Sequence, residues 1–289
     1  MSIALSSRNP AVEVQRTTQL ALAKENGDAF DIRRGLRRCE FQAFVQPKFD
    51  LESQAVRCVE VLARWRHPVR GLLPPSAFIA LMTRENLLDE LFCCLLEQGL
   101  RSQIEVHRQG HKIGIALNLS LQQLASESLV DRLIARLLLH PLPLSSVTLE
   151  ITEDTTAYIS PDIQQRLARL KAVGIRLSMD DFGTGYSSLW RLSQLPFDEL
   201  KLAGEFIRHI EYSSLARIVV RHVLALAEEL ELPLIVEGIE TEAQRSILMA
   251  LGVRYGQGYL CAKPMPASSL GSWLHGSRQR SGGQLSKGV

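Results

Sequence analysis

The stretch IRLSMDDFGTGYSSL, residues 175–189, decides how this sequence is interpreted. Its apolar run Ile175–Met179 has the composition of a buried strand, and Asp180 and Asp181 follow before a glycine-rich loop. Side chains alternate along a strand, so two neighbouring aspartates reach one pocket only where the chain leaves the pleat, a bend that Gly183 allows. Two adjacent carboxylates repel each other unless a cation lies between them. The stretch predicts a strand that ends at a divalent-metal site; alternatively, the aspartates only cap a turn.

Apolar runs of this kind alternate with amphipathic helical patterns along the chain. The expected strands are 41–46, 58–65, 112–119, 147–151, 175–179, 199–202, 233–236 and 254–260. The expected helices include 87–107, 129–139, 163–173, 214–230 and 241–251. Near-continuous hydrophobic strands that alternate with helices indicate a parallel sheet covered by helices. Eight such strands favour an α/β fold of the closed (β/α)8 TIM-like barrel type.

The first connection departs from this pattern. Only residues 47–57 join the first expected strand to the second, and KFDLESQA at 48–55 is typical of a hairpin turn. A parallel crossover needs about a dozen or more residues, usually including a helix. We therefore expect the first strand to run antiparallel to the second.

One domain is expected over residues 28–275, since no Pro-, Gly- or Ser-rich linker interrupts it. Residues 1–27 are expected to form a lead-in that is a weak helix or flexible. Residues 276–289 are rich in Ser, Gly, Gln and Lys without apolar periodicity, so a disordered tail is expected.

The composition excludes several classes of protein. Hydrophobic residues make up 46% of the chain, enough for a large core, and a net charge of +2 is too balanced for a DNA- or RNA-binding coat. The five cysteines form no CxxC pair, which favours reduced thiols and a cytoplasmic protein. No segment approaches the about 20 consecutive apolar residues that a membrane helix requires. We expect a cytoplasmic protein with no nucleic-acid partner and no membrane segment.

Polar residues lie within or just after seven of the expected strands. They are Glu60 and Arg64, Asn118, Glu150 and Glu153, Asp180 and Asp181, Lys201, Glu237 and Glu240, and Gln257. Burying such groups costs on the order of several kcal/mol unless they are paired or metal-bound, and active sites of (β/α)8 enzymes lie at the carboxyl ends of the strands. Carboxylates with an amide oxygen and no His or Cys favour Mg²⁺ or Mn²⁺.

The number of carboxylates exceeds what one ion needs, so a site for two ions that bridges a water and phosphate oxygens is expected. Lys201 would either assist deprotonation of that water or hold the phosphate.

Each of these side chains also has a simpler explanation. Glu60 would pair with Arg64 within one strand, Asn118 would cap a helix that begins at Ser120, and Lys201 would be a surface lysine. Glu240 is as well explained by a helix cap as by a place beside the metal ligands.

Six motifs together resemble the EAL-domain family, phosphodiesterases that open cyclic di-GMP to the linear dinucleotide pGpG. The motifs are EVLARWRHP at 60–68, NLS at 118–120, LEITE at 149–153, DDFGTGYSSL at 180–189, VEGIE at 236–240 and QGYL at 257–260. The similarity extends from about Leu36 to Leu270, most of the chain.

The resemblance implies a (β/α)8 barrel with an antiparallel first strand, hydrolysis of cyclic di-GMP, and a homodimer. It implies roles by position, with Mg²⁺ or Mn²⁺ as the metal. The first metal would be bound by Glu60, Asn118, Glu150 and Asp180, and the second by Asp181. The catalytic residues would be Lys201, Glu237 and Gln257, and the substrate contacts would be Gln46, Leu62 and Arg64. Glu153 would brace the loop after the fifth strand. Ca²⁺ is expected to inhibit, because its coordination is longer and looser than that of Mg²⁺.

Two departures from the family pattern matter. Val61 replaces the alanine of the eponymous motif, a small apolar exchange, and Ala203 stands where the family usually has aspartate, which would loosen Lys201. The alternative function is a non-catalytic cyclic di-GMP receptor or a protein-interaction module with the same fold. The complete set of metal ligands favours the enzyme.

Overall fold

The structure, a computed structural model, describes residues 29–152, 159–184 and 188–284. The chain divides into two compact units, one of residues 1–41 and 64–91 and the other of residues 42–63 and 92–289. The lead-in predicted for residues 1–27 lies outside the described residues.

The larger unit contains the barrel. Its strands are β1 (Phe41–Asp50), β2 (Val56–His67), β4 (Gly114–Leu119), β5 (Val147–Ile151), β6 (Arg176–Phe182), β7 (Glu199–Leu202), β8 (Leu234–Val236) and β9 (Tyr255–Gln257). From β2 to β9 they pair in parallel in chain order, apart from β3, and β1 closes the ring against β9 and β2. The predicted eight-stranded barrel is confirmed.

β1 is antiparallel to β9, with Lys48 opposite Gln257. Because β2 and β9 belong to the same parallel series, β1 is also antiparallel to β2, as the short first connection predicts. The connection is a tight turn in which Asp50 accepts hydrogen bonds from the backbone N–H of Ser53 at 2.9 Å and from its hydroxyl at 2.9 Å. Gln54 takes a φ of 57° in this turn. The short strand β10 (Met265–Pro266) also pairs antiparallel with β1.

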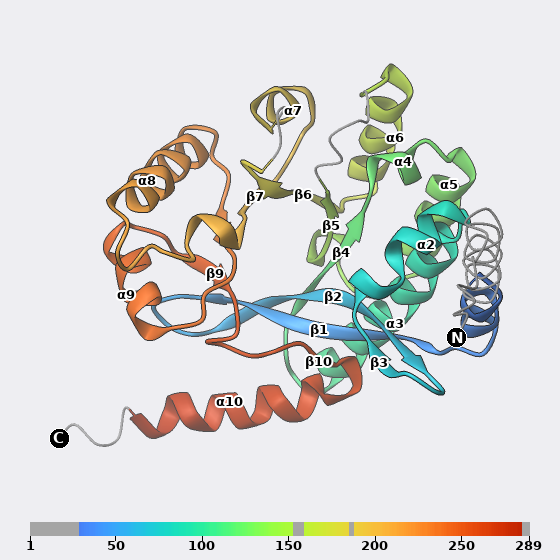
Figure 1. Cartoon of the computed structure of the whole chain (residues 1–289), viewed down its shortest axis with the longest axis horizontal. Helices are drawn as coiled ribbons and strands as arrows, with labels where there is room; N and C mark the ends of the chain where they lie inside the picture. The colour runs from blue at the N-terminus through green and yellow to red at the C-terminus, as the bar shows by residue number, and fades with distance from the viewer. Residues whose placement is uncertain (1–28, 153–158, 185–187, 285–289) are drawn as a thin grey trace, which may run out of the picture. The chain divides into compact units, whose positions relative to one another are not determined.

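Helices follow the parallel strands and lie around the outside of them (Figure 1). They are α3 (Leu88–Arg108), α4 (Leu121–Leu124), α5 (Glu127–Leu138), α6 (Pro161–Ala172), α7 (Ser188–Gln194), α8 (Ser214–Glu229) and α9 (Glu242–Ala250). Serine or threonine side chains cap the first turns of α4, α5, α6, α8 and α9 by accepting a backbone N–H, which fixes where each helix begins. Buried aliphatic residues of α8 and α9, including Val220 and Leu248, pack in one core cluster with Leu200 and Val236 of the strands.

The smaller unit is built around aromatic side chains. The ring of Trp65 stacks on Phe41 at 5.1 Å between centroids, and Phe78 meets Phe41 edge-on at 5.3 Å. The unit contains a helix at 29–37, the β2–β3 hairpin with β3 at Gly71–Leu73, and α2 (Ile79–Arg84).

The last helix, α10 (Leu270–Gln284), occupies part of the segment for which we expected disorder. Leu270 and Leu274 are buried, and a helix nucleated on such packed residues gains a hydrogen bond with each residue that it adds. Residues 276–284 are therefore helical, and residues 285–289 lie outside the described part of the chain. Among the described residues, no helix combines the length and apolar character needed to cross a membrane.

Candidate metal centre

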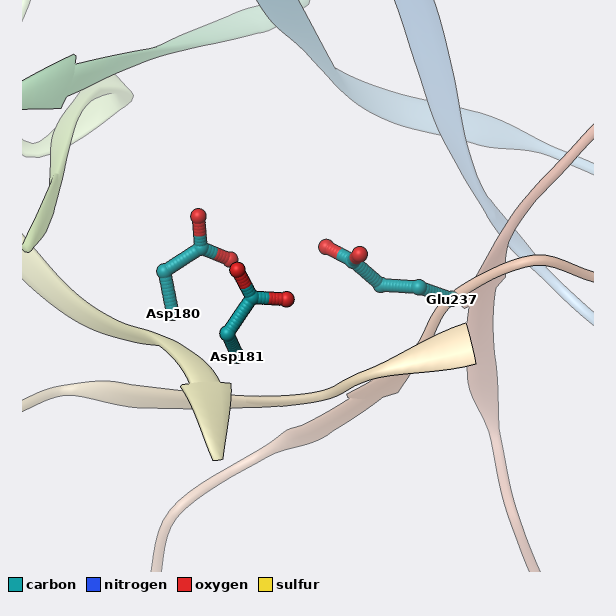
Figure 2. Close-up of side chains that lie close together, drawn as sticks. All are labelled: Asp180, Asp181 and Glu237. Carbon is teal, nitrogen blue, oxygen red and sulfur yellow. The ribbon is translucent and has the colours of Figure 1, made fainter. Parts of the chain in front are cut away.

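The end of β6 brings two adjacent aspartates to one site. β6 pairs with β7 at Met179 and again at Phe182, with an irregularity between them, and Asp181 takes a left-handed φ of 52°. This bulge rotates one residue out of the alternating pleat. Carboxylate oxygens of Asp180, Asp181 and Glu237 all lie within 4.8 Å of one another, and Figure 2 shows the three side chains converging. The bend predicted from the sequence is present.

Gly183 makes the turn after the bulge possible. Its φ is 94°, a backbone conformation that residues other than glycine rarely adopt. A Cβ at this position would also lie 2.9 Å from the ring of Phe206.

The ammonium group of Lys201 lies at the centre of the site. Its Nζ is 2.6 Å from Glu237 Oε1, 2.7 Å from Asp180 Oδ1 and 2.9 Å from Glu150 Oε2. Glu60 Oε2 lies further away, at 3.7 Å. Lys201 is 1% exposed, so its interpretation as a surface lysine is wrong. Four strands, or the residue just after one, thus present carboxylates to a single buried cation.

Amide side chains order the other side of Glu60. Asn118 donates to Glu60 Oε1 at 2.7 Å, and Gln257 donates to Glu60 Oε2 at 2.6 Å. Gln257 Nε2 also lies 3.3 Å from Gln46 Oε1. Helix α4 is capped by Ser120, so the interpretation of Asn118 as the cap is wrong. These amides fix the orientation of a buried carboxylate.

A second buried lysine, not identified from the sequence, holds Glu150 from behind. Lys48 Nζ lies 2.7 Å from Glu150 Oε1 and 2.6 Å from Glu199 Oε1, and Ser178 donates to the same Glu199 oxygen at 3.0 Å. Glu150 is 0% exposed and lies between two ammonium groups. Lys48 follows Pro47 in a segment that is typical of a turn. Its inward orientation could have been predicted only if β1 had been extended to Asp50, since Gln46, Lys48 and Asp50 then lie on one face of the strand.

The electrostatics of the site are strongly coupled. Burial opposes ionisation of Glu150, but Lys201 and Lys48 lower its pKa to about 2. Burial raises the pKa of Glu237 to about 8, against the opposing effect of Lys201 and with a further contribution from Asp180. Burial works against the charge of Lys201, yet the surrounding carboxylates, Glu150 first, raise its pKa well above the ordinary value. Glu150 and Lys201 are therefore the firmly charged members.

The charges of the remaining carboxylates are balanced less fully by the nearby ammonium groups. Burial raises the pKa of Glu60, of Asp180 and of Asp181, and neighbouring carboxylates add to each shift. Glu205, which was not identified from the sequence, contributes to the shift at Asp181.

The donor set fits a divalent cation. Five carboxylates face two ammonium groups, one of which is shared with Glu199, so the cluster carries more negative than positive charge. Burial first, and this surplus second, raise the pKa values of the carboxylates, and a divalent cation would relieve the surplus. The buried Oε1 of Gln257 has no hydrogen-bond partner among the described residues, so it can accept from a bound water. Oxygen donors without His or Cys suit a hard cation.

Several predicted residues do not enter this geometry. Leu62, whose side chain is aliphatic, lies half-buried on β2, and Arg64 belongs to the smaller unit, where it is half-buried. Glu153 lies outside the described residues. The cap of α9 is Thr241, so the interpretation of Glu240 as the cap is wrong.

Ala203, the departure from the family pattern, is 2% exposed. Lys201 is held by carboxylates from other strands, and none of its ion pairs needs a side chain at position 203.

Fold and site together define a (β/α)8 barrel with an acidic cluster at the carboxyl ends of its strands, whose carboxylates could hold a metal ion. The family model of the EAL domain matches residues 30–264. The chain belongs to the EAL domain family.

Relatives with known activity are similar over most of this chain. The cyclic di-GMP phosphodiesterase RocR of Pseudomonas aeruginosa is 41% identical over 247 residues, 86% of this chain and 63% of RocR. NbdA of the same organism, also a cyclic di-GMP phosphodiesterase, is 35% identical over 92% of this chain and 33% of its own length. A solved structure of the PaMucR phosphodiesterase in a c-di-GMP complex covers 84% of this chain and 99% of its own, with 37% identity and a TM-score of 0.79. The chain spans less than two thirds of the length of these two curated relatives.

Proposed function

We propose that this chain hydrolyses cyclic di-GMP to linear pGpG with the help of divalent metal ions. The observation that carries the proposal is the ring of carboxylates from separate strand ends around Lys201. The similarity to named cyclic di-GMP phosphodiesterases supports it.

We assign one metal to Glu60, Asn118, Glu150 and Asp180, and a second to Asp181, with Mg²⁺ or Mn²⁺ as the ions. When bound, such ions lower the pKa of a water molecule and neutralise charge on phosphate oxygens. The contacts of Glu60 with Asn118 and Gln257, and of Glu150 with Lys48, support this assignment because they pre-orient the carboxylates.

In the reaction, a water oxygen bonds to phosphorus, the bond from phosphorus to the 3′ oxygen breaks, and the 3′ oxygen leaves as a hydroxyl after taking up a proton from solvent. Lys201 acts as an ammonium that stabilises negative charge on the attacking oxygen and the phosphate, since its surroundings favour the charged form. Glu237 accepts the proton of the water, a role supported by its place beside Lys201, at 2.6 Å, and next to Asp180 and Asp181. Gln257 positions the water through its unpartnered Oε1.

The substrate contacts Gln46, Leu62 and Arg64 remain proposals from the family pattern, as does the bracing role of Glu153. The side chain of Gln46 supports its part of the proposal, because it lies beside Gln257 and donates to the carbonyl of Ala262 at 3.2 Å. Arg64 would bind a phosphate through its planar guanidinium.

The test is to incubate purified protein with cyclic di-GMP and Mn²⁺ and to follow pGpG by chromatography. Wild-type protein should form pGpG, and Glu60→Ala should not. Val61→Ala, which restores the family residue next to Glu60, is the matched control and should retain turnover. Turnover retained by Glu60→Ala would contradict the assignment, and a stable complex without product would instead favour a receptor.

Two finer proposals concern the metal. Ca²⁺ should inhibit the Mn²⁺-supported reaction, because it prefers longer bonds and more ligands. Asp181→Asn should reduce the Mn²⁺ stoichiometry measured by calorimetry from two per chain to one. An unchanged stoichiometry would remove Asp181 from the second site.

We also propose that the chain forms a homodimer. Exposed apolar side chains on and before helices α7 and α8 support this, among them Trp190 (66% exposed), Tyr212 (89%) and Leu215 (68%). Sedimentation of wild-type protein and of Leu215→Glu tests it. The cytoplasmic location stays a prediction.

A further inference from the structure

A cavity of about 670 Å³ opens at the end of the barrel opposite the acidic cluster. Its wall includes the first residues of the parallel strands β4, β6 and β7, which are Gly114, Arg176 and Glu199. Asp180 lies near the other end of β6 and Glu237 follows the end of β8. The cavity and the metal centre therefore occupy different ends of the same unit.

Besides Lys48, which is paired with Glu150 and Glu199, three cations from separate elements line this cavity. They are Arg57 on β2, Lys112 just before β4 and Arg176 on β6. Within the described part of the chain, none of the three forms an ion pair, and Arg176 donates only to the backbone carbonyl of Asp198, at 3.0 Å. Like charges that share a concave surface repel each other and concentrate a positive potential in it.

The nearby acids cannot neutralise these cations, because other groups already bind them. Glu199, the only carboxylate among the described lining residues, accepts from Lys48 at 2.6 Å and from Ser178 at 3.0 Å. The carboxylate of Asp198 contacts Lys171 at 2.5 Å and the backbone N–H of Leu177 at 2.8 Å. The positive charge of the cavity thus has no internal counterpart.

The rest of the wall suits a small organic molecule. Phe49, Ile235 and Tyr255 provide apolar and aromatic surface, and the hydroxyls of Ser145 and Thr148 provide donors. A volume of this size falls within the range of about 300–1,000 Å³ found for small-molecule sites. Gly114 helps to keep the space open, since a Cβ there would lie 3.0 Å from the carbonyl oxygen of Ser146.

We propose that this cavity is a second ligand site, which binds a small organic phosphate such as a mononucleotide. The phosphate is recognised by Arg57, Lys112 and Arg176, since guanidinium and ammonium groups are the usual partners of phosphate oxygens. The apolar part of the ligand packs on Phe49 and Tyr255. The proposal needs neither the metal nor the hydrolytic activity.

The test is calorimetric titration of the full chain with AMP in the presence of EDTA, with adenosine as the uncharged control. AMP should bind saturably, and adenosine at least about tenfold more weakly, because it lacks the charged group. The double variant Arg57→Gln/Lys112→Gln should weaken AMP binding by at least about tenfold. Both side chains are exposed, so the variant should fold normally, as its thermal midpoint will show.

The matched control is Arg132→Gln, which removes an exposed arginine from α5, away from the cavity wall, and should leave AMP affinity unchanged. AMP that fails to bind at millimolar concentration would overturn the proposal. Equal binding of adenosine, or unchanged affinity in the double variant, would also overturn it, since AMP at the acidic end of the barrel does not meet Arg57 or Lys112.

Discussion

Replacing Lys48 by methionine tests whether the buried ion pairs of the barrel are held as the structure shows them. The ammonium group of Lys48 is 3% exposed and contacts Glu150 and Glu199 at 2.7 and 2.6 Å. Burial disfavours its charge, but Glu150 and Glu199 raise the pKa of Lys48 above its ordinary value, so the group is an ammonium at neutral pH. Methionine keeps an unbranched apolar stem like that of lysine and removes the ammonium group.

The expected cost follows from the partners left behind. Breaking a buried ion pair by removing one member costs about 3–5 kcal/mol, because the other charge stays buried without compensation. Glu150 keeps Lys201 at 2.9 Å and Glu199 keeps the Ser178 hydroxyl at 3.0 Å, so we place Lys48→Met near the lower limit, about 3 kcal/mol.

The assay is urea unfolding of the metal-free protein at pH 7. Adding Glu199→Gln to Lys48→Met should recover part of the loss, because it removes a buried charge that has lost its partner. A matched control is Lys171→Met, which removes a half-buried ion pair with Asp198 and should cost about 1 kcal/mol or less. A loss below about 1 kcal/mol for Lys48→Met, with strictly additive effects in the double variant, would refute the reasoning.

Three further predictions concern stability. Burial opposes ionisation of Asp50, but hydrogen bonds from Ser53 and the neighbouring Arg254 lower its pKa. The free energy of unfolding that Asp50 adds over Asp50→Asn is therefore complete above about pH 4 and shrinks as the pH falls below that value. Urea unfolding of both proteins across pH will measure it. Gly258→Ala should prevent folding, as judged by soluble yield and circular dichroism, because its Cβ would overlap the backbone of Ile239, whereas Gly276→Ala, with open space around it, should be neutral or stabilising. Mn²⁺ should raise the thermal midpoint above that in EDTA, by an amount that corresponds to about 2.7 kcal/mol at a hundredfold excess over Kd; an unchanged midpoint would argue against a metal site in the folded state.

The barrel could be predicted from the sequence because its strands are buried on both faces. Runs such as Val147–Ile151 and Glu199–Leu202 coincide with β5 and β7. The short strands β3 and β10 were not predicted, since two or three residues carry no measurable periodicity. The end of β1 was missed for a related reason: the polar residues of the segment 47–50 are typical of a turn, although they continue the strand to Asp50.

The same error hid Lys48. Residues that lie at strand ends, such as Asp180 and Glu237, could be grouped because parallel strands bring their carboxyl ends together. Lys48 lies on the antiparallel strand, where the carboxyl end points to the opposite side of the barrel. Its contact with Glu150 depends on pairing across the barrel between residues about a hundred positions apart, which no local pattern records.

This arrangement explains how one barrel can hold an acidic cluster at one end and a basic cavity at the other. Glu199 and Lys48 both line the basic cavity, and because they pair with each other, Glu199 does not offset the other cations there. Lys48 also contacts one oxygen of Glu150 and Lys201 contacts the other, so the two ammonium groups share the charge of this carboxylate. Because a buried charge needs a partner within a few ångströms, the interior ion pairs fix how much unbalanced charge each end presents. The negative surplus at one end and the positive surplus at the other therefore do not cancel each other.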